Sequence, residues 1–216
     1  MDFKNIIFDL GGVLADLKTR EAFLEFRNFG LPLPARLIDA NQPLSGESSD
    51  EYVVNLIHRM DVGDITGDEF IDEILSRCKP EITRQQIVSA YNDMIEVPVG
   101  RLKLLAQLKK KYGVYLLSNI GDMHWTAFCN DVTACGFDVD ELFDRKYLSY
   151  KLHLAKPDPR IFTTMIEDAG FNPSECLYID DNHNNIVEGT KAGLLGFEIK
   201  PNSLEEYIPE LFTDNI

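Results

Sequence analysis

The chain has 216 residues, a formal net charge of −15 and a hydrophobic content of 44%. The negative charge disfavours partners that bind clustered Lys and Arg, so we expect neither a nucleic-acid partner nor a membrane partner. No apolar run approaches the roughly 20 residues of a membrane-spanning helix. The length suits one ordinary domain or a domain with a smaller insert, and the start of the chain lacks the features of a signal peptide. We therefore expect a globular, cytoplasmic protein.

The first apolar run, residues 5–8, contains β-branched and aromatic side chains and leads directly into Asp9. This composition predicts a strand that is buried on both faces, as in a parallel sheet. Gly11 and Gly12 follow and indicate a tight turn. Asp9 is therefore either an exposed functional carboxylate, able to act as a nucleophile or a metal ligand, or a turn aspartate that bonds to the backbone.

The next part of the chain, residues 17–96, shows no convincing strand. Two capping boxes, Thr66 to Glu69 and Thr83 to Gln86, each open an amphipathic stretch. These signals predict an all-helical insert between the first strand and the rest of a sheet.

Strands and helices alternate in the rest of the chain. Strands are predicted at residues 114–117 and 176–179, and helices at 99–111 and 159–169. This alternation is typical of an α/β fold. The predicted boundaries are a core of residues 1–16 and 97–216 and a cap of residues 17–96.

Polar residues follow both later strands, Ser118 and Asn119 after one and Asp180 and Asp181 after the other. The carboxyl ends of parallel strands meet at one edge of a sheet, so we expect these groups to form one site with Asp9. A hydroxyl and an amide suit phosphate oxygens. Adjacent carboxylates repel each other unless a cation such as Mg²⁺ balances them, although an acidic pair can also be a solvated turn.

Lys156 lies in the segment Ala-Lys-Pro-Asp-Pro, in which two prolines stiffen the approach to a helix. A lysine held at a site can balance a carboxylate or a phosphoryl group as a compact charge. The alternative is a lysine that is simply solvated.

The order of these groups resembles the haloacid dehalogenase-like (HAD) hydrolase superfamily: an aspartate after the first strand, Ser-Asn after the second, then Lys-Pro and an acidic pair. The resemblance covers essentially the whole chain and is to the subfamily with a helical cap between the first two motifs. It implies a Rossmann-like core with helices on both faces of a parallel sheet. It also implies a Mg²⁺-dependent phosphatase that works through an aspartyl-phosphate.

By position, the resemblance implies that Asp9 is the nucleophile and that Lys156 orients Asp9 and offsets its charge. Ser118 and Asn119 would bind the transferring phosphoryl group. The expected partner is a small phosphorylated metabolite, and specificity would come mainly from the cap.

The resemblance further implies that Mg²⁺ is held by Asp9, the backbone carbonyl of Gly11, Asp180 and Asp181, with Asp181 the favoured direct ligand. Phosphatases of this superfamily usually have a second aspartate, which acts as acid and base, at the position of Gly11. General acid–base help is typically worth about 10² to 10⁴ in rate, so its loss at this position matters.

Two residues could replace the missing acid, Asp16 at the mouth of the cap and His183 beside the acidic pair, although loop residues of this kind are commonly just solvated. The Asp-Leu-Gly subset of the family resembles this chain and includes phosphatases of glucose 1-phosphate, whose anomeric leaving group is less demanding than an ordinary alcohol.

Other functions stay open. The missing acid allows a catalytically weak or silent protein that binds phosphorylated ligands. A haloacid dehalogenase is a further alternative, but such enzymes do not keep the full acidic pair. A phosphomutase is disfavoured because it depends directly on the missing acid.

The remaining signals are weaker. Trp125 is either a stacking surface for a sugar or an aromatic residue of the core. The four cysteines form no Cys-x-x-Cys pair, so we expect buried, reduced thiols.

Overall fold

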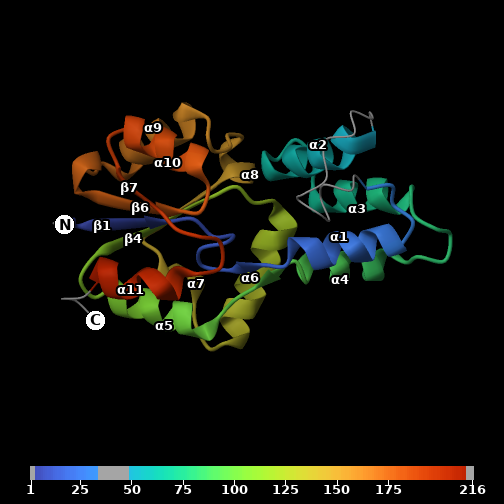
Figure 1. The fold of residues 1–216 in the computed structure, drawn as a ribbon, viewed down its shortest axis with the longest axis horizontal. Helices are drawn as coiled ribbons and strands as arrows, with labels where there is room; N and C mark the ends of the chain where they lie inside the picture. Colours follow the sequence, from blue (N-terminus) through green and yellow to red (C-terminus); the bar gives the residue numbers. More distant parts are fainter. Residues whose placement is uncertain (1–2, 34–48, 213–216) are drawn as a thin grey trace.

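The computed structural model describes residues 3–33 and 49–212; residues 34–48 of the predicted insert lie outside this part. A five-stranded parallel sheet forms its centre (Figure 1). The strands are, in spatial order, β5 (Arg145–Leu148), β4 (Gly113–Ser118), β1 (Asn5–Phe8), β6 (Cys176–Asp180) and β7 (Leu195–Glu198). The strands predicted at residues 5–8, 114–117 and 176–179 are thus confirmed.

The central strand β1 is buried on both faces because its side chains alternate between two hydrophobic clusters. Ile6 and Phe8 belong to one cluster, and Ile7 belongs to the other. Neighbouring strands follow the same period of two, which explains why the run is continuously apolar.

Helices cover both faces of the sheet (Figure 1). On one face lie α5 (Val99–Leu108), α6 (Asp122–Ala134), α7 (Val139–Leu142) and α11 (Leu204–Phe212). The other face carries α9 (Pro159–Ala169) and α10 (His183–Lys191), while α8 (Ser149–Leu152) directly follows β5 and a short 3₁₀ turn (Pro173–Glu175) precedes β6. The helix predicted at 159–169 has its predicted bounds, whereas the one predicted at 99–111 ends three residues earlier, at Leu108.

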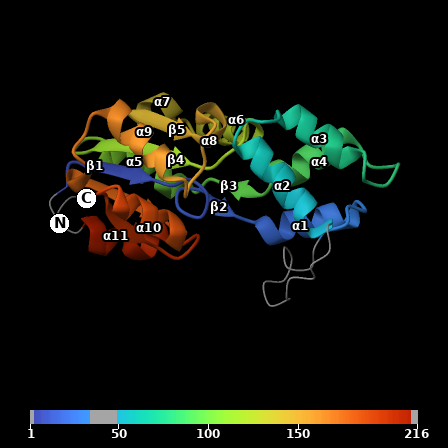
Figure 2. The same cartoon turned by 90° about the horizontal axis from the view of Figure 1, so that it is seen from above.

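A second group of helices lies beyond the carboxyl ends of the strands (Figure 2). It comprises α1 (Thr19–Asn28), α2 (Ser49–Asp61), α3 (Gly67–Leu75) and α4 (Arg84–Asn92). These helices bury a hydrophobic cluster of their own, which includes Phe26, Phe70 and Tyr91. Both predicted capping boxes are present, at the starts of α3 and α4. No helix in the described ranges is long and apolar enough to cross a membrane.

Two short strands connect the helical group to the sheet. β2 (Asp16–Leu17) pairs antiparallel with β3 (Ile95–Glu96). The prediction of no strand within residues 17–96 is therefore wrong at both ends, because two-residue strands are too short to show a period. The pairing supports the proposed division into a core of residues 1–16 and 97–216 and a cap of residues 17–96.

The cysteine prediction is confirmed in part. All four thiols are free, but only Cys176 is buried, and Cys78, Cys129 and Cys135 are half-buried.

The cap packs on the core through Tyr91 and His124. The two rings are stacked with centroids 3.9 Å apart, and His124 Nε2 lies 2.8 Å from the carbonyl oxygen of Tyr91. Burial lowers the pKa of His124 to about 4, and the bond to Tyr91 opposes this only partly. The imidazole is therefore neutral at neutral pH and serves as a structural contact.

We expect His124 to make the protein less stable as the pH falls from about 6.5 to about 4. In this window the unfolded chain binds a proton at His124 and the folded chain does not, which costs up to about 3 kcal/mol at about 1.4 kcal/mol per pKa unit. Chemical denaturation at several pH values measures the free energy of unfolding. Between about pH 6.5 and 4, this free energy should fall less for His124→Gln than for the wild type. Equal pH dependence in the two proteins would contradict this role of His124.

Candidate active site

Asp9 stands at the carboxyl end of the central strand. Its N–H donates to the carbonyl oxygen of Ile179, 2.9 Å away, which extends the pairing of β1 with β6 by one residue. The carboxylate is buried, and its Oδ1 accepts a hydrogen bond of 2.7 Å from the N–H of Leu10. The strand and the turn together fix the direction of this side chain.

Lys156 is buried between two carboxylates. Its Nζ lies 2.8 Å from Asp9 Oδ1 and 2.7 Å from Asp180 Oδ2. Burial lowers the pKa of Lys156, but Asp9 and Asp180 outweigh burial and raise it above its usual value. Lys156 is therefore a permanent cation at this site.

Asn119 holds the backbone of Lys156. Its Nδ2 donates to the carbonyl oxygen of Lys156, and its Oδ1 accepts from the N–H of Lys156, both at 2.8 Å. The loop between α8 and α9 is thus tied to the end of β4. Asn119 positions the lysine, a contact that the sequence did not predict.

Asp180 is fully buried and is held by four donors. Its Oδ2 accepts from Lys156 Nζ at 2.7 Å and from the Tyr178 hydroxyl at 2.5 Å, and its Oδ1 accepts from the N–H of Asn182 at 2.8 Å. Asn185 Nδ2 lies 3.1 and 3.2 Å from the two oxygens. An ionised carboxylate has about four lone-pair sites, so these contacts nearly use up its capacity.

Asp181 lies against the turn that follows Asp9. Gly12 has a φ of +77°, and a Cβ at this position would stand 2.8 Å from Asp181 Cγ. Only glycine combines this left-handed backbone with such a close approach. The second glycine of the turn therefore makes room for the acidic pair.

The carboxylates of Asp9, Asp180 and Asp181 form a cluster, with one oxygen of each within 4.8 Å of the others. Burial raises the pKa of Asp9 to about 7; Lys156 opposes this rise and Asp180 adds to it. Burial and the charge of Asp180 also raise the pKa of Asp181. A cluster of oxygen donors whose ionisation is disfavoured fits a hard divalent cation, which would restore the ionised form.

Ser118 is buried at the end of β4. The strand register places it next to Leu148, and Phe8, the residue before Asp9, pairs with Leu116. Ser118 and Asn119 thus reach the edge of the sheet at which Asp9 and Asp180 lie, as the sequence predicted from the strand ends.

Neither candidate for the missing acid is brought to this cluster by a described contact. Asp16 Oδ1 lies 2.7 Å from Nη1 of Arg101, which also binds Glu205. His183 is exposed, and its Nδ1 lies 2.8 Å from Glu198. Both side chains are held by other partners.

Trp125 packs against the hydrophobic core. Its ring lies 5.6 Å from that of Phe128, centroid to centroid, next to the cluster on that face of the sheet. This packing favours the interpretation as a core aromatic over that of a sugar-stacking surface.

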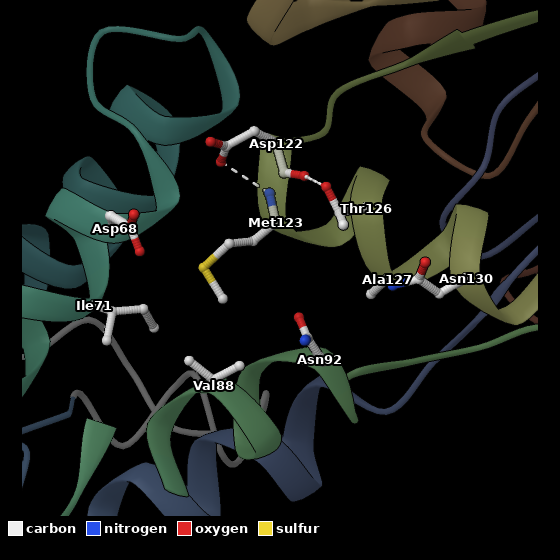
Figure 3. Close-up of a pocket in the computed structure, with 9 residues that line it drawn as sticks. All are labelled: Asp68, Ile71, Val88, Asn92, Asp122, Met123, Thr126, Ala127 and Asn130. Carbon is white, nitrogen blue, oxygen red and sulfur yellow. Dashed lines mark hydrogen bonds between the residues drawn. The ribbon is translucent and has the colours of Figure 1, made fainter. Parts of the chain in front are cut away.

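Two of the cavities at the junction of cap and core lie near predicted or buried functional residues. One, of about 310 Å³, separates α3 and α4 from α6, and the Asn92 amide points into it (Figure 3). None of the three clustered carboxylates lines it. The other, of about 390 Å³, is lined by both cap and core residues, among them His58, His153 and Lys156, and so reaches the loop that carries the buried lysine.

Sequence reasoning missed Tyr178 and Asn185, which bind Asp180 together with Lys156. Tyr178 precedes Asp180 by two residues on the same strand, so the alternation of side chains could have placed both on one face. Asn185 lies in the first turn of α10, and no comparable signal marks it.

Known proteins match this chain over most of its length. A sequence model described as haloacid dehalogenase-like hydrolase matches residues 3–193. The D-ribitol-5-phosphate phosphatase of Bacteroides thetaiotaomicron is 33% identical over 198 residues, which make up 90% of this chain and 91% of that protein.

Solved structures share the fold of this chain. A HAD-family enzyme from Bacteroides thetaiotaomicron, in complex with magnesium and inorganic phosphate, is 33% identical with a TM-score of 0.77, over 93% of this chain and 96% of that chain. The L-2-haloacid dehalogenase of Xanthobacter autotrophicus is 19% identical with a TM-score of 0.58, over 99% of this chain and 84% of that chain. The second likeness is one of fold alone.

We expect Gly12→Ala to displace the carboxylate of Asp181, because the added Cβ would overlap it and the left-handed backbone disfavours alanine. Isothermal titration with MgCl₂ should show binding weakened by tenfold or more. Gly136→Ala is the matched control: Gly136 also has a positive φ, +83°, but an added Cβ meets nothing within 4 Å. Equal magnesium binding in the two variants would contradict this role of Gly12.

Proposed function

Because the chain belongs to the haloacid dehalogenase-like hydrolases, we propose that it is a Mg²⁺-dependent phosphatase of a small phosphorylated metabolite, with Asp9 as its nucleophile. The observation that carries this proposal is the buried ammonium of Lys156, which joins Asp9 to Asp180 beside a third carboxylate. The relative that is 33% identical is a phosphatase.

Asp9, the carbonyl of Gly11 and Asp181 are the proposed direct ligands of Mg²⁺. Asp180 would belong to the metal site as well, although its four donors already hold it against Lys156. When bound, Mg²⁺ supplies positive charge to the transferring phosphoryl group. The site needs this charge, because three carboxylates and one ammonium sum to −2.

In the first step, Asp9 attacks phosphorus in line with the ester oxygen. The described contacts of its carboxylate, to Lys156 and to the N–H of Leu10, both fall on Oδ1, so Oδ2 is the attacking oxygen. The bond from Oδ2 to phosphorus forms as the bond to the ester oxygen breaks. Lys156 keeps the carboxylate oriented, and the Ser118 hydroxyl donates to a phosphoryl oxygen.

In the second step, water attacks the phosphorus of the aspartyl-phosphate. The P–Oδ2 bond breaks, inorganic phosphate leaves and the Asp9 carboxylate is restored. The ester oxygen that leaves in the first step takes its proton from solvent, because Gly11 offers no carboxyl group and Asp16 and His183 bind other residues. The enzyme therefore depends on the leaving group more strongly than a phosphatase that has a general acid.

The proposed substrate is a sugar phosphate or a polyol phosphate. One candidate is D-ribitol 5-phosphate, after which the relative is named. Another is glucose 1-phosphate, which the resemblance of the Asp-Leu-Gly motif implies. The first has a primary alcohol as leaving group and the second has an anomeric oxygen, so the two together test the role of leaving-group protonation.

We expect phosphate release from a sugar-phosphate panel to need Mg²⁺ and to fall by at least about 10³ in Asp9→Asn, because the amide is not a nucleophile. The measurement is free phosphate with MgCl₂ and with excess chelator. Asp140→Asn, which changes an exposed carboxylate on α7, is the matched control and should keep wild-type rates. Release that survives chelation, or the Asp9 substitution, would contradict the proposal. Ligand binding without turnover would favour the silent alternative.

We expect a higher kcat/KM for glucose 1-phosphate than for D-ribitol 5-phosphate, because the anomeric oxygen leaves more easily without a proton from the protein. Initial rates at matched Mg²⁺ concentration measure both values. A kcat/KM for D-ribitol 5-phosphate that is equal or higher would mean that the protein supplies a proton, or that recognition of the alcohol outweighs the chemistry.

A further inference from the structure

Asn202, in the loop between β7 and α11, binds both ends of the turn that follows Asp9. Its backbone N–H donates to the carbonyl oxygen of Gly12 at 2.7 Å. Its side chain binds the backbone of Leu17 in both directions: Oδ1 accepts from the N–H at 2.9 Å, and Nδ2 donates to the carbonyl oxygen at 3.2 Å. One residue therefore holds the segment of residues 12–17 at both of its ends.

The side-chain amide of Asn202 takes the place of a strand beside β2. Lys18 donates its N–H to the carbonyl oxygen of Met94 at 2.7 Å, so the backbone groups of the preceding residue, Leu17, point away from β3. A side-chain amide carries a donor and an acceptor, as a backbone edge does. Asn202 has a φ of +60°, a left-handed conformation that asparagine adopts more readily than most residues. The residue type thus suits both the backbone and the contact.

These contacts fix the backbone around the proposed carbonyl ligand, Gly11. The N–H of Gly12 donates to the carbonyl oxygen of Ala15 at 2.8 Å, and the carbonyl oxygen of Gly12 accepts from Asn202. In a trans peptide the C=O and N–H point in opposite directions, so the first bond directs the Gly11 carbonyl away from Ala15. Leu17 packs on Gly11, because a Cβ on Gly11 would stand 3.2 Å from Leu17 Cδ2. The peptide planes on both sides of Gly12 are therefore held, one from within the turn and one by Asn202.

Arg101 ties the neighbouring residue, Asp16, to the same C-terminal segment. Its buried guanidinium lies 2.7 Å from Asp16 Oδ1 and donates to both carboxylate oxygens of Glu205, at 2.8 and 3.0 Å. Glu205 lies three residues after Asn202, in the first turn of α11. The segment that binds Leu17 therefore also holds Asp16, and the two contacts support each other.

We propose that Asn202 is a positioning residue for the metal site: it holds the turn so that the carbonyl of Gly11, and the space that Gly12 leaves for Asp181, stay in place. The inference rests on the proposed phosphatase function, in which Gly11 and Asp181 bind Mg²⁺. The described contacts of Asn202 are to Gly12 and Leu17, so it acts on the site through this turn.

Three substitutions separate the side chain of Asn202 from its backbone. Asn202 is exposed, so its side chain can be replaced without opening a cavity. Asn202→Gly keeps the left-handed backbone, and with it the bond to Gly12, but removes both side-chain bonds to Leu17. Asn202→Ala also strains the backbone, because a positive φ disfavours alanine. Ser203→Gly is the matched control: it adds a glycine to the same loop and removes a side-chain bond to the carbonyl of Lys200, which lies outside the turn.

The test is isothermal titration of MgCl₂ into each folded protein. We expect the affinity for Mg²⁺ to fall at least threefold in Asn202→Gly and further in Asn202→Ala. In Ser203→Gly it should stay within twofold of the wild type.

A second measurement separates positioning from general stability. The rate of phosphate release is followed against Mg²⁺ concentration, with the best substrate of the sugar-phosphate panel. In Asn202→Gly the Mg²⁺ concentration for half-maximal rate should rise at least threefold, whereas kcat at saturating Mg²⁺ should stay within twofold of the wild type. The reason is that Asp9, Lys156 and Ser118 keep their own contacts. A residue that only stabilised the fold would leave both values unchanged in the folded protein.

Wild-type Mg²⁺ affinity in both Asn202→Gly and Asn202→Ala would overturn the inference. So would an equal loss in Asn202→Gly and Ser203→Gly, because the stiffness of the loop, and not the side-chain amide, would then set the affinity. If the wild type binds no Mg²⁺ and releases no phosphate, the proposed function itself fails and the inference falls with it. The outcomes above concern a wild type that does bind Mg²⁺, and they test the inference alone.

Discussion

The ammonium group of Lys156 between Asp9 and Asp180 is the interaction on which the rest of the site depends. A buried charge is costly unless it is paired and hydrogen-bonded, and this lysine has both partners within 2.8 Å. Forming the pair requires β1 and β6 to be neighbours, since each delivers one carboxylate. It also requires the end of β4, from which Asn119 fixes the loop of the lysine. The order of the three central strands is thus tied to one buried cation.

The clustered carboxylates divide the work of the proposed reaction. The oxygens of Asp180 accept hydrogen bonds from Lys156, Tyr178, Asn182 and Asn185. Asp180 therefore mainly holds Lys156 in place. Asp9 and Asp181 have carboxylate oxygens available for the reaction and for the metal. Their burial raises the pKa of both groups, so their ionised forms are disfavoured. A preorganised site needs both kinds of group. Asp180 is fixed by its hydrogen bonds, whereas Asp9 and Asp181 have oxygens free to react or to bind a metal.

The sheet and the approximate site could be predicted from the sequence because they follow from local patterns. Apolar runs end in polar residues at Asp9, Ser118 and Asp180, and parallel strands bring such ends together. The bonds of Asn119 to Lys156 and of Ser149 to the carbonyl oxygen of Asp61 could not be predicted in this way. They join loops that are distant in the sequence, and their partners are backbone groups, which leave no mark in the order of residue types.

The pairing of β2 with β3 has a consequence for how such a protein can change over evolutionary time. The chain leaves the core at Leu17 and returns at Ile95, and these residues face each other in an antiparallel ladder, in which opposed Cα atoms are about 5 Å apart. Any helical module with adjacent ends can be grafted at this point without stretching the sheet. Under the proposed function, exchanging this one segment would change the selectivity for substrate, while the residues at the strand ends stay in place.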